Sequence, residues 1–71
     1  MNDPLWRQSD GTPLACIEKI KMLNENIQEI RQAAQDALAD ALLMGCDEEQ
    51  IRAVLQDLMA NLENPFRGKK K

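Results

Sequence analysis

The fold is decided by residues 41–51, ALLMGCDEEQI, where one helix can end and another can begin within a few residues. Gly45 follows a long segment of periodic apolar residues and can take the left-handed conformation that closes a helix. Asp47 to Gln50 then has the form of a capping box, in which Asp47 accepts from the Gln50 amide while the Gln50 side chain reaches back. The acidic residues also lie at the positive end of the helix that follows. The stretch therefore predicts a tight turn between two helices.

The first of these helices is expected over residues 13–44. Thr12-Pro13 is typical of a helix start, because the hydroxyl can accept from an unpaired amide and proline lacks only a donor that would be unpaired there. Apolar residues then repeat every seven positions in two rows, which form an a/d seam over about four heptads. The rows are Ile20, Ile27, Ala34 and Ala41, and Cys16, Leu23, Ile30, Ala37 and Met44.

The second helix is expected over residues 48–63, because its apolar residues follow the spacing of one wide helical face. Those residues are Ile51, Val54, Leu55, Leu58, Met59 and Leu62. Asn64-Pro65 should end the helix, since a residue before proline is disfavoured in helical conformation. Residues 1–12 are expected to be an irregular arm, and residues 64–71 a basic tail.

The two helices differ in length, at about 48 Å and about 24 Å. The second can therefore cover only the second half of the first, and the large aliphatic side chains of the first half are expected to stay bare. Burying each of them would contribute about 1.5–3 kcal/mol, so a monomer leaves stabilisation unused. We therefore predict an all-α helical hairpin that dimerises into an antiparallel four-helix bundle, each bare half being covered by the partner's alanine-rich half and second helix. The expected interface consists of Cys16, Ile17, Ile20, Leu23, Ile27, Ile30, Ala34, Ala37 and Ala41.

Composition narrows the classes of protein that remain. The chain has 71 residues, a net charge of −3 and no histidine. Residues 1–64 carry twelve acidic and five basic side chains, whereas residues 65–71 carry four basic side chains and no acidic ones. An acidic body repels phosphate, so nucleic acid is not expected as a partner. The longest apolar run is far shorter than a bilayer span requires, and the N-terminus lacks the pattern of a secretory signal, so we expect a cytoplasmic protein that does not enter a membrane.

Residues for catalysis or metal binding are lacking. There is no histidine base, no glycine-rich phosphate loop and no ligand spacing for zinc, so we expect no enzyme, no cofactor and no metal. Cys16 and Cys46 are interpreted as a small core residue and a turn residue, and the alternative is a symmetric pair of intermolecular disulfides. Trp6 is interpreted as an aromatic plug over the bundle, and the alternative is an exposed anchor for another protein. Phe66 has the same two interpretations.

The plan resembles that of small dimeric helical-hairpin proteins, in architecture only. The expected function is that of a non-enzymatic protein–protein interaction module, an adaptor, small chaperone or regulator that acts as a homodimer. One alternative is a nucleic-acid regulator whose dimer displays its basic tails with Arg7, Lys19, Lys21 and Arg31. Another is a half-bundle that a different protein completes.

Overall fold

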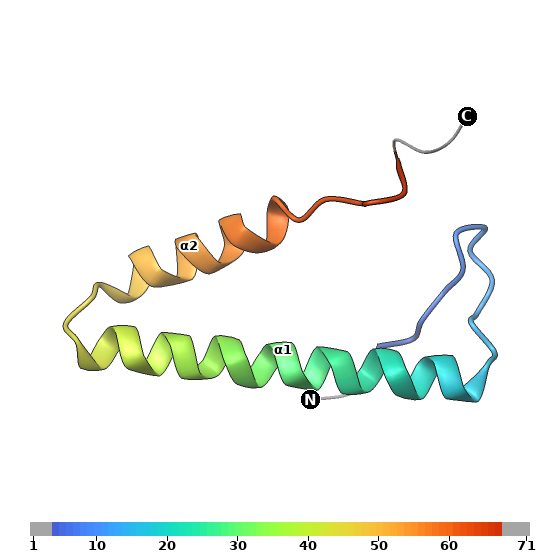
Figure 1. Cartoon of the computed structure of the whole chain (residues 1–71), viewed down its shortest axis with the longest axis horizontal. Coiled ribbons are helices and arrows are strands. Elements are labelled where there is room, and N and C mark those ends of the chain that lie inside the picture. The colour runs from blue at the N-terminus through green and yellow to red at the C-terminus, as the bar shows by residue number, and fades with distance from the viewer. Residues whose placement is uncertain (1–3, 68–71) are drawn as a thin grey trace. The chain divides into compact units, whose positions relative to one another are not determined.

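The structure is a computed structural model that describes residues 4–67, and within that range it consists of two α-helices without β-strands (Figure 1). Helix α1 is Ile17–Leu43 and helix α2 is Glu48–Ala60. The predicted all-α hairpin of a long and a short helix is confirmed. Half of the predicted basic tail, residues 68–71 with Lys69, Lys70 and Lys71, lies outside the described residues.

The turn between the helices has the capping geometry that its sequence predicts. Gly45 has a φ of 94°, and its amide donates to the Leu42 carbonyl at 3.1 Å. The Cys46 amide donates to the Ala41 carbonyl at 2.8 Å, which completes a Schellman motif. On the other side of the turn, the Asp47 carboxylate accepts from the Gln50 amide at 2.9 Å. The Gln50 side chain does not follow the predicted box: its Oε1 lies 3.8 Å from the Cys46 thiol.

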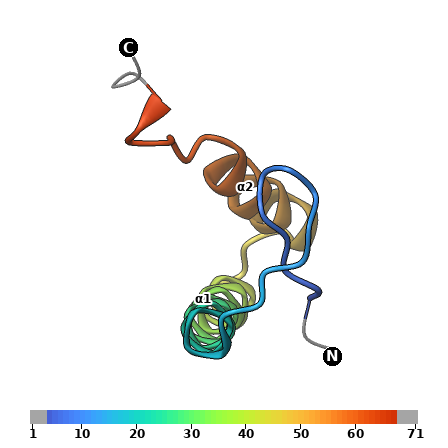
Figure 2. The ribbon, with the colours of Figure 1, turned by 90° about the vertical axis from the view of Figure 1, so that its right-hand side faces the viewer.

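The start of α1 differs from the prediction. The helix begins at Ile17 and not at Pro13, because Thr12 and Pro13 belong to a closed loop of the arm (Figure 2). Pro13 pairs with Arg7 in an isolated antiparallel bridge. Both the amide and the hydroxyl of Thr12 donate to the Asp10 carboxylate, at 3.0 and 2.7 Å. The hydroxyl oxygen itself accepts from Gln8 Nε2 at 2.9 Å, so its accepting role is used within the arm and not at a helix start. The arm of residues 4–16 is therefore a loop that its own hydrogen bonds close.

Helix α2 also ends earlier than predicted, at Ala60 and not at residue 63. The Asn61 side chain donates to the Asp57 carbonyl at 2.8 Å and so satisfies a carbonyl of the last turn. Asn64 instead forms a separate turn, in which its side chain accepts from the Phe66 amide at 2.8 Å. Asparagine side chains that bond to nearby backbone groups favour helix ends and turns over helix interiors.

The chain is divided into two compact units, Met1–Ala33 and Ala34–Lys71, and α1 passes from one into the other. In the first unit, half-buried residues lie on the arm and on one face of α1. These are Trp6, Leu14, Ile20, Leu23 and Asn24. In the second unit, Ala41 is 9% exposed and is the one buried residue among those described. Around it, half-buried residues come from the end of α1 and the start of α2: Ala34, Leu38, Ile51 and Leu55.

Candidate functional site

The most prominent feature of the surface is apolar. The predicted interface residues of α1 share one face, and the structure divides them by burial. Ala41 is buried, and Ile20, Leu23 and Ala34 are half-buried. Ile27 and Ile30 are 38% and 46% exposed. Cys16, Ile17 and Ala37 are exposed as well.

The prediction of a uniformly bare first half is therefore wrong at Ile20 and Leu23. The physical reason is the arm, which returns towards α1 (Figure 1). The Trp6 indole nitrogen donates to Asn24 Oδ1 at 2.7 Å. Asn24 lies one turn after Ile20 on the same face of the helix. This bond ties Trp6 to α1 of its own chain. Its roles as a plug over a bundle and as an anchor for a partner both stay predictions.

A second apolar surface lies on α2. The α2 row, which we define as Val54, Leu58, Met59 and Leu62, lies on one side of the helix, and all four side chains are exposed. Leu58 and Leu62 are 51% and 69% exposed. The sequence predicted this face but treated it as a cover for α1, so the α2 row was not among the predicted site residues. The helical spacing of its leucines was the signal that could have identified it.

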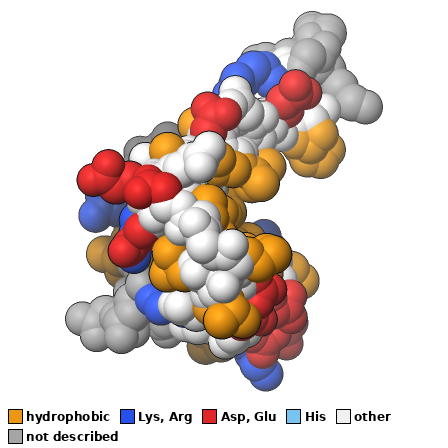
Figure 3. All heavy atoms as spheres, turned by 90° about the vertical axis from the view of Figure 1, so that its left-hand side faces the viewer, with side chains coloured by type: hydrophobic (Ala, Val, Ile, Leu, Met, Phe, Trp, Pro, Cys, Tyr) orange, Lys and Arg blue, Asp and Glu red, His pale blue; other side chains and the backbone are white. Residues whose placement is uncertain are grey.

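Further apolar side chains are exposed at the turn end of the second unit (Figure 3). Leu43 and Met44 are 87% and 80% exposed. Leu42 lies beside them and is also exposed. Monomeric proteins rarely expose contiguous apolar patches of large extent, so surfaces of this kind often mark contacts with other molecules.

The polar groups offer little for chemistry. The described residues contain no group of three histidine, cysteine or acidic side chains that could hold a metal ion. Cys16 is exposed and Cys46 is half-buried, and both thiols are free. Arg52 pairs with Glu48 at 2.9 Å, but both side chains are more than half exposed, so this bridge stabilises the helix by well under 1 kcal/mol.

The hydrogen bonds from the Thr12 hydroxyl and the Thr12 amide lower the pKa of Asp10 below its usual value of 3.8. This carboxyl therefore stays charged near neutral pH, and its role is to close the loop of the arm. The shift comes from hydrogen bonds within an exposed loop and not from a desolvated pocket, so it gives no indication of catalysis.

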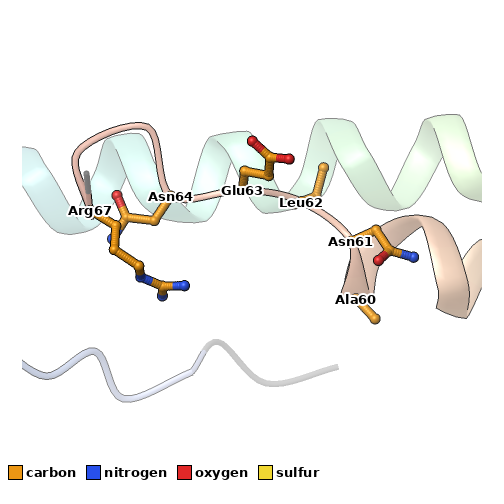
Figure 4. A pocket seen from close by; sticks show the side chains of 6 residues that line it. All are labelled: Ala60, Asn61, Leu62, Glu63, Asn64 and Arg67. Atoms are coloured by element: carbon orange, nitrogen blue, oxygen red, sulfur yellow. The ribbon is translucent and has the colours of Figure 1, made fainter. Parts of the chain in front are cut away.

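A hollow lies beyond the end of α2, lined by Ala60, Asn61, Leu62, Glu63, Asn64 and Arg67 (Figure 4). All of its lining residues are exposed, and their side chains point in different directions around it. A binding site for a small molecule is usually concave and apolar, with a few converging polar groups. The lining of this hollow is mostly polar, and its polar side chains do not converge on one point. The apolar surfaces are therefore the stronger candidates for function.

No protein-family model, curated protein or solved structure matches this chain. Among the residues that the structure describes, neither helix combines the length and the hydrophobicity that crossing a bilayer would require.

Proposed function

We propose that this chain is a non-enzymatic helical interaction module that acts as a homodimer, with two hairpins packed antiparallel as a four-helix bundle. The observation that carries this proposal is the near absence of a core: of the described residues, Ala41 alone is buried. Many large apolar side chains are left in water, and burying each would contribute about 1.5–3 kcal/mol. A second copy would supply the missing half of the core.

The chain has a mass of 8.1 kDa, and this small size supports the same proposal. Domains this small usually need a source of stability beyond their own core, such as disulfides, a bound metal or a second chain.

The proposed interface is the apolar face of α1, from Cys16 and Ile17 through Ile27 and Ile30 to the alanines of its second half. Alanines let two helices approach closely, as bundle cores require. Ile27 and Ile30 are central, because they are large and exposed. We expect Ile20 and Leu23 to contribute less to the stability of the dimer than the sequence analysis predicted, since both are already half-buried in the single chain.

A role as an adaptor, small chaperone or regulator would follow from this proposal, because the most prominent features of the described residues are exposed apolar surfaces. The two free thiols fit a reducing compartment, and the cytoplasm remains the predicted location. Recognition of nucleic acid is less favoured, since the chain carries a net charge of −3.

The test is sedimentation equilibrium of the reduced chain over a hundredfold concentration range, with two variants of equal charge. Ile27→Lys places a charge in the proposed interface, whereas Met22→Lys places it at an exposed position about 140° around α1 from Ile27. We expect a mass near twice 8.1 kDa for the native chain and for Met22→Lys. Ile27→Lys should weaken the dimer at least tenfold.

A folded monomer at all concentrations would overturn the homodimer and favour the half-bundle that another protein completes. A dimer that both lysine variants leave intact would show that the face of α1 is not the interface. Circular dichroism of each variant separates loss of the dimer from loss of the helices.

A further inference from the structure

We propose that the α2 row of one copy docks on residues 17–30 of α1 in a second copy, head to tail, so that the start of each α1 lies near the turn of its partner. This inference rests on the proposed homodimer. It adds the surface of the partner that the α2 row contacts, and an argument for the antiparallel orientation.

The apolar face of α2 contains both half-buried and exposed side chains. Ile51 and Leu55 are half-buried in the second unit. The α2 row, which begins at Val54 between them, is exposed, and Leu62 extends it beyond the end of the helix at Ala60. Helix α2 thus has one part of its face in use within its own unit and another part available to a partner.

The receiving surface is the exposed part of the first half of α1. Ile17, Ile27 and Ile30 are exposed there. From Ile17 to Ile30 the helix rises about 20 Å, and from Val54 to Met59 about 8 Å, so the helical part of the row fits within this stretch. Both surfaces consist of branched or flexible aliphatic side chains, which pack well between helices.

Charge favours the head-to-tail orientation. Residues 4–33 carry four acidic and four basic side chains, a net charge of 0. Residues 34–67 carry seven acidic and two basic side chains, a net charge of −5. A head-to-tail dimer places each acidic segment against a neutral one. A parallel dimer would place the two acidic segments side by side, where like charges repel.

The native cysteines provide a direct readout of this orientation. Cys16 directly precedes α1 and Cys46 follows its end, so about 40 Å of helix separates them within a chain. Head to tail, Cys16 of one copy lies at the same end of the dimer as Cys46 of the other. A short bis-maleimide, which joins two thiols by thioether bonds, can then link unlike cysteines but not like ones.

The crosslinking experiment uses Cys16→Ser and Cys46→Ser, each alone and mixed in equal amounts after unfolding and refolding together. We expect neither variant alone to form a covalent dimer and the mixture to form one. Covalent dimers in each variant alone would indicate a parallel pair and overturn both this inference and the antiparallel packing, while self-association itself would stand. A native chain that sediments as a monomer would overturn the homodimer and this inference with it.

The docking of the α2 row is tested by Leu58→Lys, with Gln56→Lys as a matched control that adds the same charge to the same helix outside the row. We expect Leu58→Lys to raise the dimer dissociation constant at least tenfold and Gln56→Lys to change it less than threefold. Equal effects of the two variants, with both helices intact by circular dichroism, would overturn the assignment of the row.

Discussion

The indole nitrogen of Trp6 donates a hydrogen bond to the Oδ1 atom of Asn24, at 2.7 Å and across 18 residues of sequence. This bond ties the arm to the first half of α1, beside the half-buried Ile20 and Leu23. A polar side chain on the apolar face of a helix usually needs a partner where water is excluded. Asn24 and Trp6 supply that partner to each other, so part of the face that a second copy could use is already covered.

Replacing Asn24 with alanine should loosen the arm. The acceptor for the indole is lost, and a hydrogen bond of this kind contributes about 0.5–1.5 kcal/mol. Trp6 is the one tryptophan of the chain, so its fluorescence reports directly on the arm. We expect red-shifted emission and stronger quenching by acrylamide in Asn24→Ala.

The matched control is Asn26→Ala, which makes the same change at an exposed position two residues farther along α1. It should leave the emission unchanged. Equal spectra for the native chain and both variants would contradict the importance of the contact between Trp6 and Asn24.

Sequence reasoning predicted the centre of the chain better than its ends. The turn depends on local signals, and Gly45 and Asp47 adopt the conformations that their residue types favour. The start of α1 was mispredicted because Thr12-Pro13 fits both a helix start and the loop that Asp10 closes. Asp10-Gly11, a common turn pair, was the local signal for that loop. The contact between Trp6 and Asn24 is remote in sequence, so no periodicity could reveal it.

The candidate site was predictable in part. The seven-residue repeat of α1 identified a face that contains Ile27, Ile30 and Ala41. It could not show that the arm would half-bury Ile20 and Leu23, because that depends on tertiary contacts. For the same reason the pattern of α2 identified an apolar face but not which of its residues stay exposed.

Gly45→Ala should destabilise the chain by about 1–2 kcal/mol, because alanine is strained in the left-handed region. Gly45 has a φ of 94°, and a Cβ there would meet no atom within 4 Å, so the cost is backbone strain and not a clash. Gly45→Asn should be less destabilising, since asparagine tolerates this region better. Urea unfolding followed by circular dichroism, at one fixed chain concentration, measures the free energy of unfolding of the native chain and of both variants. Equal stability of Gly45→Ala and the native chain would contradict the role of the turn.

Asp47→Ala should cost about 1 kcal/mol, because the amide of Gln50 loses its acceptor at the start of α2. Asp47→Ser keeps an acceptor and should recover most of this stability. Loss of the cap acts locally, so hydrogen exchange should rise most at the first amides of α2 and little in the first half of α1. A uniform rise along both helices would indicate a global effect instead of a cap.

The loop of the arm should open at acidic pH. The bonds from the Thr12 hydroxyl and amide lower the pKa of Asp10 below 3.8, so the folded loop binds the proton more weakly than the unfolded chain. The stabilisation from this carboxylate is therefore complete above pH 3.8 and is lost as the pH falls through the lower, folded pKa. An NMR titration of the Asp10 carboxyl and the Thr12 amide should give a common midpoint below 3.8. Asp10→Asn should remove that transition, and a midpoint at or above 3.8 in the native chain would contradict the hydrogen-bonded loop.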